Sequence, residues 1–447
     1  MVGMSIEKAL AACGGRFVGE GSLARELGRV VIDSREIREG DLFVAYRGEH
    51  VDGHDYITAA LDKGAACCLA ERVPEGETRG VIVTDDVQTA LEKIAAAYRD
   101  MLSLPIIGIT GSVGKTSAKE MISSVLQSRM RILKTDKNLN NQIGVPMTLS
   151  RITSEHEAAV VEMGISGFGE MSALARMVRP DIAVFTLIGH AHLEFLHDLD
   201  GVLRAKTEML AFVPDDGTVI MNGDDEKLRD FPCRQRKITF GLGENCDVRA
   251  ENIAQNAEGT RCEILIGQRK LPVMIPAFGR HLVYAALEGA AVGSVMGLSD
   301  EEIIRGISAY QTVGRRSAVC RTGRITLLDD CYNSNPDALK SGIDSLLELT
   351  GRPVCILGDM LELGENSPQM HLETGRYARQ KGVARVLSCG KMGRYTCEGA
   401  GDIARLFEDR ASLIAALREE IREGDCVLVK ASRGAHFEEI SEALKVL

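Results

Sequence analysis

A glycine-rich segment near residue 110 has the residue types of a phosphate-binding loop. It reads "GITGSVGKTS", ends the apolar run "PIIGIT" and leads into a helical pattern. Glycines admit left-handed backbone angles, so successive N–H groups can surround an anion, and the start of a helix adds its positive end. A lysine supplies full charge, and a threonine hydroxyl can ligate Mg²⁺. The segment predicts a nucleotide triphosphate site made by Thr110, Gly111, Ser112, Val113, Gly114, Lys115, Thr116 and Ser117.

This loop departs from the usual spacing G-x-x-x-x-G-K-[ST]. Ile109 stands where the first glycine belongs, which leaves the shorter pattern T-G-x-x-G-K-T. The alternative interpretation is an ordinary glycine turn between a strand and a helix, with its lysine in solvent. The order of strand, turn, helix and Gly-Lys-Thr favours the phosphate loop, but it does not identify the reaction.

Polar residues also follow the neighbouring apolar runs. Glu162 ends "AAVVEMG", and His190, His192 and Glu194 follow "DIAVFTL". Because ligands of open α/β sheets bind beyond the carboxyl ends of the strands, these side chains should lie near the loop. Glu162 offers the hard oxygen that Mg²⁺ prefers, and His192 is a softer candidate. Zinc competes for the histidine cluster, but its expected Cys/His partners are absent, and each residue alone could be a cap or a surface group.

A second set of polar residues follows three apolar runs in the last third of the chain. The set comprises Asp329, Asp330, Asn333, Asn335, Asp359, Lys430, Ser432 and Arg433. Two α/β blocks with facing polar edges predict a cleft that closes on its substrate. Lys206, in "VLRAKTEML", has by contrast the spacing of an ordinary exposed helix lysine.

The elements that position these residues fall into three blocks. Residues 1–102 alternate short strands and helices. Residues 103–313 alternate apolar strands with helices, which is typical of a mainly parallel sheet covered on both faces, and Val248–Ile275 indicates antiparallel strands at its edge. Residues 314–447 restart the alternation as a Rossmann-like α/β domain. We therefore predict an α/β protein of three domains with a central P-loop-type sheet, joined by short segments that could act as hinges.

Bulk composition narrows the class of partner. The 447 residues are 45% hydrophobic and 26% charged, and the net charge of −11 comes without any Lys/Arg tract, which argues against nucleic acid or an anionic membrane as partner. The first residues do not resemble a signal peptide, and no run approaches the about 18 apolar residues of a membrane span, so we expect a cytoplasmic protein, as a monomer. The twelve cysteines form no C-x-x-C pair, which favours reduced core thiols over disulfides or zinc.

Taken together, these segments resemble the Mur ligases, the ATP-dependent amide-forming enzymes of peptidoglycan precursor synthesis. The resemblance covers nearly the whole chain. Its segments are "DSREIREGDLFVAYRGEHVDGHDYI", "TGSVGKTSAKEM", "NLNNQIGVPMTL", "VVEMGISGFGEM", "GHAHLEFL", "LLDDCYNSNPDAL", "LGDMLELGENS" and "VLVKASRG". The first segment and the last three resemble the members whose substrates are UDP-N-acetylmuramoyl-tripeptide and D-alanyl-D-alanine.

The resemblance implies a role for each matched residue. Lys115 and Thr116 would hold the ATP phosphates and one Mg²⁺, whereas Glu162 and His192 match residues around a second Mg²⁺. Lys206 matches a lysine that the family carries as a metal-bound carbamate, which reverses the expectation from its spacing. The remaining nucleotide contacts would be His281, Arg315, Asp330, Tyr332, Asn333 and Asn335. The substrate contacts would be Ser34, Arg35, Gly48, Asp52, His54, Asn138, Asn140, Asn141, Asp359, Lys430, Ser432 and Arg433.

One departure from the family pattern concerns the base of the nucleotide. The family helix begins G-x-H-N-x-x-N, whereas here Leu282 and Ala285 stand at the asparagine positions. Adenine would then be recognised by backbone groups, or across the cleft by Tyr332, Asn333 and Asn335.

Three other functions stay open at this point. A folylpolyglutamate synthetase-like ligase should lack the "DSREIREGDLF" domain, which is present here. A P-loop NTPase regulator would hydrolyse nucleotide without joining substrates, and a non-catalytic homologue would do neither.

Overall fold

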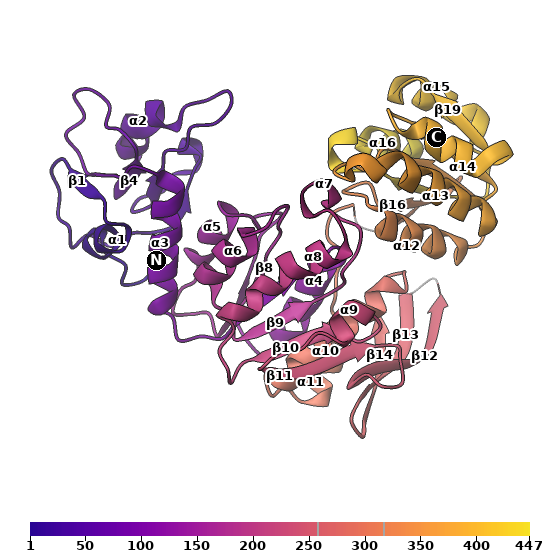
Figure 1. The fold of residues 1–447 in the computed structure, drawn as a ribbon, viewed down its shortest axis with the longest axis horizontal. Coiled ribbons are helices and arrows are strands. Elements are labelled where there is room, and N and C mark those ends of the chain that lie inside the picture. The colour runs from indigo at the N-terminus through magenta and orange to yellow at the C-terminus, as the bar shows by residue number, and fades with distance from the viewer. Residues whose placement is uncertain (257–258, 316–317) are drawn as a thin grey trace.

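The computed structural model describes residues 1–256, 259–315 and 318–447, and Figure 1 shows them as three lobes in a row. Each lobe is built on one sheet with helices packed against it. The strands are mostly parallel, which confirms the predicted α/β class. No helix in these ranges is long and apolar enough to cross a membrane.

The N-terminal lobe holds a five-stranded sheet in the order β1-β5-β4-β3-β2. All neighbours in it are parallel except β1 and β5. Its strands are β1 (Arg16–Val18), β2 (Val30–Val31), β3 (Leu42–Val44), β4 (Cys67–Ala70) and β5 (Val81–Val83), and its helices are α1 (Ile6–Cys13), α2 (Ile57–Asp62), α3 (Val87–Asp100) and the 3₁₀ turns η1 (Ser34–Glu36) and η2 (Gly53–Tyr56).

The central lobe holds nine strands in the order β14-β13-β12-β11-β10-β9-β6-β8-β7. The strands from β7 to β12 run parallel to their neighbours, and β12, β13 and β14 form the antiparallel edge that the sequence predicts. The strands are β6 (Ile106–Thr110), β7 (Ile132–Lys134), β8 (Ala158–Glu162), β9 (Ile182–Phe185), β10 (Thr218–Asn222), β11 (Arg236–Gly241), β12 (Val248–Asn256), β13 (Gly259–Ile266) and β14 (Arg269–Ile275).

Helices cover both faces of the central sheet, because its strands are apolar on both sides. One apolar cluster joins the sheet to α4 (Lys115–Gln127), α10 (His281–Val295) and α11 (Asp300–Ser308). The other joins it to α5 (Gly144–Leu149), α6 (Glu170–Val178) and α8 (Leu199–Thr207). The shorter helices of this lobe are α7 (Leu193–Leu196), α9 (Glu226–Arg229) and η3 (Glu208–Phe212).

The C-terminal lobe holds six strands in the order β15-β16-β20-β17-β18-β19, of which only the β15–β16 pair is antiparallel among the described pairings. Apolar clusters lie on both faces of this sheet. The strands are β15 (Ala318–Arg321), β16 (Thr326–Asp329), β17 (Arg352–Leu357), β18 (Arg385–Cys389), β19 (Ala404–Phe407) and β20 (Asp425–Lys430). The helices are α12 (Pro336–Leu347), α13 (Ser367–Gln380), α14 (Gly393–Ala400), α15 (Arg410–Glu420), α16 (Glu438–Lys445) and the turns η4 (Gly364–Asn366), η5 (Gly401–Ile403) and η6 (Arg433–Ala435).

The two joints between lobes differ. Across the first, the apolar core is continuous, and α3 is tied to the central lobe by Tyr98, whose hydroxyl donates to the Ile152 carbonyl at 2.6 Å, and by Arg99, which pairs with Asp181 at 3.0 Å. This packing ties the first two lobes together across the joint near residue 103, and the hinge that we expect there stays a prediction. The C-terminal lobe has its own cores and meets the central lobe beside α7, as Figure 1 shows.

All twelve cysteines are free thiols, and most are buried in these cores. Burial raises the pKa of buried thiols such as Cys262 and Cys331, each to about 11. Eight of the twelve are buried, which confirms the predicted core position of most of them, and their reduced state stays a prediction.

Candidate active site

The phosphate loop joins β6 to α4 at the carboxyl edge of the central sheet. Two of its glycines have left-handed backbone angles, with φ of +151° at Gly111 and +89° at Gly114, where the helix begins. A Cβ atom on Gly111 would lie 1.9 Å from the Thr186 hydroxyl oxygen, and that hydroxyl donates to the Val113 carbonyl. Only glycine fits here, because residues just after β9 hold the loop so closely.

Lys115 and Lys206 meet inside this site. The Lys115 ammonium donates to the Gly111 carbonyl at 2.6 Å, so the side chain folds back over its own loop. Lys206, on α8, is 1% exposed, and burial, followed by the nearby charge of Lys115, holds its pKa well below the usual range. The exposed position expected from spacing alone is wrong, because α8 turns this residue inward.

A neutral buried amine is the form of lysine that can react with carbon dioxide to give a carbamate. The chemistry that the resemblance implies for Lys206 is therefore compatible with its surroundings, although the modification itself stays a prediction.

Glu162 ends β8 and is 2% exposed. Its carboxylate accepts from the Thr116 hydroxyl at 2.9 Å and from the Asn140 amide at 2.8 Å. Its backbone N–H donates to the Thr135 hydroxyl at 3.0 Å, and the Lys119 ammonium lies 3.9 Å from the carboxylate. Three side chains thus contact this buried carboxylate beside the phosphate loop, and a fourth holds the backbone of Glu162.

The donor set around Glu162 fits Mg²⁺. This ion prefers oxygen ligands and is usually held by one or two carboxylates together with substrate phosphates, not by an all-protein cage. Thr116 and Glu162 supply adjacent hydroxyl and carboxylate oxygens. Outside the gaps at 257–258 and 316–317, no group of three or more His, Cys, Asp or Glu side chains is arranged to hold a metal ion, so a zinc site finds no support there.

The two histidines after β9 face the C-terminal lobe. The Nδ1 atom of His192 lies 2.5 Å from a carboxylate oxygen of Glu362, and the backbone N–H of His190 donates to Asp337 at 2.6 Å. A side-chain hydrogen bond with Asp337 raises the pKa of His190, and one with His192 lowers the pKa of Glu362. The predicted role of His192 as a metal ligand stays a prediction, because the contact seen here is to Glu362.

The predicted residues of the C-terminal lobe gather at the ends of β16, β17 and β20. The buried Lys430 ammonium pairs with Asp330 at 2.6 Å and donates to the Asn333 carbonyl at 3.1 Å. The Arg433 guanidinium lies 5.6 Å from the centre of the Tyr332 ring. This cluster reaches the central lobe at His281, the first residue of α10, because the charges of Asp330 and Lys430 act on its pKa, which burial lowers.

Four other predicted residues have internal partners. Asn335 caps α12 by accepting from the Ala338 N–H at 2.8 Å, and Ser432 accepts from the Leu361 N–H at 2.9 Å. Asp359 accepts from the N–H groups of residues 391 and 392. Arg315 reaches Glu442 on α16 at 2.7 Å. These contacts order the strand ends but do not identify a ligand.

The residues predicted to contact the UDP-sugar lie in loops of the N-terminal lobe. Ser34 and Arg35 form η1, and the Arg35 side chain is 86% exposed although it pairs with Asp33 at 2.6 Å. The Gly48 N–H donates to residue 51. Asp52 binds the His54 ring at 2.6 Å, and the N–H of residue 71 donates to the other ring nitrogen. The buried His54 ring thus holds the segments at residues 52 and 71 together.

The asparagines after β7 lie next to Glu162. Asn140 bonds to that carboxylate, and the Asn141 side-chain oxygen accepts from the Gly144 N–H at the start of α5, at 2.8 Å. Asn138 accepts at its carbonyl from the Asn140 N–H at 2.8 Å. Asn140, a predicted substrate contact, is therefore linked through the Glu162 carboxylate to Thr116 of the phosphate loop.

Four residues to which we assigned no role take part in the site or border it. Lys119 and Thr135 contact Glu162. Asp337 and Glu362 form hydrogen bonds with His190 and His192. A signal exists for Lys119, because it lies three residues after Thr116 and so shares a helix face with it. Glu362 is in the segment "LGDMLELGENS", but no spacing rule connects it with His192.

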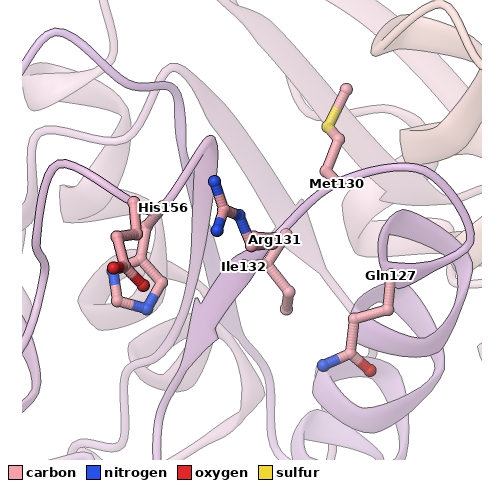
Figure 2. A pocket seen from close by; sticks show the side chains of 6 residues that line it. Gln127, Met130, Arg131, Ile132 and His156 are labelled. Atoms are coloured by element: carbon pink, nitrogen blue, oxygen red, sulfur yellow. The ribbon is translucent and has the colours of Figure 1, made fainter.

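A separate hollow of about 270 Å³ lies away from these residues, at the other end of α4 (Figure 2). It is lined by Gln127, Met130, Arg131, Ile132, Glu155 and His156. The His156 ring accepts from the Thr153 N–H, which is an internal contact of the loop. None of the residues predicted for the site lines this hollow.

Comparison with known proteins decides the family. Models of three Mur ligase domains match successive parts of the chain: the family catalytic domain at residues 26–105, the middle domain at 109–293 and the glutamate ligase domain at 314–433. A relative from Bacillus subtilis (strain 168), named UDP-N-acetylmuramoyl-tripeptide–D-alanyl-D-alanine ligase, is 36% identical over 425 residues, 93% of this chain and 92% of the relative.

The chain belongs to the Mur ligase family.

Solved structures agree with this assignment. A crystal structure of MurF from Acinetobacter baumannii superposes with a TM-score of 0.91 at 28% identity, covering 99% of both chains. MurF ligase from Thermotoga maritima, solved in complex with ADP, gives a TM-score of 0.85 at 28% identity, covering 94% of this chain and 97% of that one.

The structure shows where the two residues at the start of α10 that depart from the family pattern lie. Leu282 and Ala285 are 1% and 2% exposed and belong to the apolar cluster that also includes α4 residues. The side chains at these positions therefore pack in the core and offer no hydrogen bond to a base.

Proposed function

We propose that this Mur ligase joins D-alanyl-D-alanine to UDP-N-acetylmuramoyl-tripeptide at the expense of ATP, a step in peptidoglycan precursor synthesis. The observation that carries this proposal is the 36% identity, across 93% of the chain, to a relative named for that reaction. The phosphate loop beside buried Lys206 and Glu162 supports it, because amide formation needs a group that activates the acid.

The chemistry starts from a carboxylate, which is a poor electrophile. The terminal carboxylate oxygen of the tripeptide attacks the γ-phosphorus of ATP, the bond to ADP breaks, and an acyl phosphate forms. The amine of D-alanyl-D-alanine then attacks the acyl carbon to give a tetrahedral intermediate. Phosphate leaves with the bonding electrons, the amine loses its proton, and the amide remains.

The chain's own residues would supply position and charge. The loop N–H groups would hold the phosphates, and the Lys115 ammonium would exchange the Gly111 carbonyl for a phosphate oxygen. Thr116 and Glu162 would hold Mg²⁺, which when bound neutralises charge on the phosphates. Lys206, as a carbamate, would present a negative carboxylate in place of a neutral amine.

We assign the three blocks separate tasks. Residues 1–102 would bind the UDP-sugar, residues 103–313 would bind and use ATP, and residues 314–447 would bind the nucleotide and the incoming dipeptide. Asp330, Lys430 and His281 support a shared cleft, because they interact across the two lobes. Closure of that cleft would keep water from the acyl phosphate. We expect the enzyme to act as a monomer in the cytoplasm.

Phosphate release tests the proposal. With ATP, Mg²⁺ and UDP-linked tripeptide, steady release should require D-alanyl-D-alanine and should match the formation of UDP-linked pentapeptide one to one. Glutamate and folate substrates serve as controls for sibling ligases. Nucleotide hydrolysis at a rate that depends on neither substrate would contradict the proposal and favour an NTPase regulator.

A further inference from the structure

The loop of residues 189–194, between β9 and α7, is held by two carboxylates of the C-terminal lobe. Asp337, in the first turn of α12, accepts from the backbone N–H of His190 at 2.6 Å and faces its ring at 3.0 Å. A Cβ atom on Gly189 would lie 2.5 Å from the same carboxylate oxygen, so a side chain there would have to displace the carboxylate. The second carboxylate, Glu362, faces His192.

The backbone on both sides of the second contact is unusual. His192 and Glu362 have φ of +57° and +61°, in the left-handed region that residues with a Cβ atom rarely adopt. The segments also touch through their backbones, because the Glu194 N–H donates to the Glu362 carbonyl at 3.2 Å. Two strained residues from different lobes thus face each other, and such conformations persist where surrounding contacts enforce them, often at functional sites.

The hydrogen bond between Glu362 and His192 has a fixed donor and a fixed acceptor. An ionised carboxylate can only accept hydrogen bonds, so Glu362 requires the proton of the neutral His192 ring to be on Nδ1. The lone pair is then on Nε2, which is the atom left to bind a cation. Metal-binding histidines commonly donate their other ring N–H to a carboxylate that fixes ring orientation and tautomer.

We propose that Glu362 is a positioning residue that orients His192 and selects its tautomer, so that this predicted metal ligand is ordered only while the C-terminal lobe is docked. Asp337 acts on the same loop by fixing its backbone. The inference rests on the proposed function, since it assigns His192 a task in that reaction. It differs from a general closure of the cleft, because it makes one carboxylate of the C-terminal lobe responsible for the orientation of one side chain, His192.

The test compares Glu362→Gln and Glu362→Ala with Glu365→Gln. Glu365 is exposed, lies three residues further along, and gives the same change of charge outside the contact. Both Glu362 variants should lower kcat by about 10- to 100-fold, the range typical for partners of metal-binding histidines. The KM for UDP-linked tripeptide should stay within about twofold of wild type because the proposal gives Glu362 no contact with that substrate, and Glu365→Gln should behave as wild type.

Two further readouts separate positioning from mere structural damage. In metal-free protein without substrates, hydrogen exchange of the 189–194 amides should speed up in both Glu362 variants and not in Glu365→Gln. In a His192→Ala background, Glu362→Ala should have little additional effect on kcat, because its task is then already lost. An equal loss of kcat in both backgrounds, or unchanged exchange, or wild-type kcat in either Glu362 variant, would overturn the inference.

Failure of the proposed function looks different. If wild-type protein forms no UDP-linked pentapeptide, the proposed function fails whatever the variants do. If the wild type is active and the Glu362 variants keep wild-type kcat, only the positioning role of Glu362 fails.

Discussion

Replacing Gly111 by alanine should damage nucleotide binding out of proportion to the size of one methyl group. The new Cβ atom would lie 1.9 Å from the Thr186 hydroxyl oxygen, and the backbone angle of +151° is strained for any residue with a Cβ. The strain is on the order of 1–3 kcal/mol, and displacing the Thr186 hydroxyl from the Val113 carbonyl adds about 1 kcal/mol. Together these terms come to about 2–4 kcal/mol.

If this cost falls on the loop conformation that binds phosphate, ATP affinity should drop by about 30-fold to several hundred-fold, since 1.4 kcal/mol is a factor of ten. Calorimetric titration with ATP measures the loss. Gly267→Ala is the matched control: that glycine also has a positive φ, of +60°, but a Cβ atom there meets nothing within 4 Å. Gly267→Ala should bind ATP as wild type does. Wild-type affinity in Gly111→Ala would refute the reasoning.

The other predictions concern the two lysines of the site and one carboxylate of the N-terminal lobe. Lys115→Ala should abolish acyl-phosphate formation, measured by hydroxylamine trapping, and full ligase turnover would contradict its role. Lys206→Ala should be slow but partly restored by a small carboxylate such as formate, whereas normal wild-type activity after bicarbonate removal would contradict carbamylation. Arg79 lowers the pKa of Glu77 to about 2, so this pair stabilises the fold above about pH 4.5 and its contribution is lost as pH falls towards 2. Glu77→Gln should therefore lower the melting temperature of the protein at pH 7, by an amount equivalent to about 1 kcal/mol or less, and the difference should vanish near pH 2; a difference that is constant with pH would be inconsistent with this ion pair.

Most of the fold could be predicted from the sequence because its central strands are buried on both faces. Runs such as "IIGIT" and "AAVVE" became β6 and β8, whose residues are all buried. Among the strands that the sequence did not indicate, β7, β15 and β19 are short and half exposed and lie at sheet edges, where one side faces solvent or a loop and no apolar run is needed.

The site could be predicted only where its residues are local in sequence. The phosphate loop follows from its glycines, and Glu162 from its place at a strand end. The burial of Lys206 does not follow from spacing, because it depends on how α8 packs against the loop. The pairing of His192 with Glu362 joins two lobes across 170 residues, and no periodic signal connects residues so far apart.

The fate of one oxygen atom tests the central claim that ATP activates the tripeptide carboxylate. UDP-linked tripeptide carrying ¹⁸O in its terminal carboxylate should be turned over with ATP and D-alanyl-D-alanine, and the released phosphate analysed by mass spectrometry. An acyl phosphate transfers one carboxylate oxygen to phosphate, so each phosphate should carry one ¹⁸O. Phosphate free of ¹⁸O, released while amide still forms, would contradict the account.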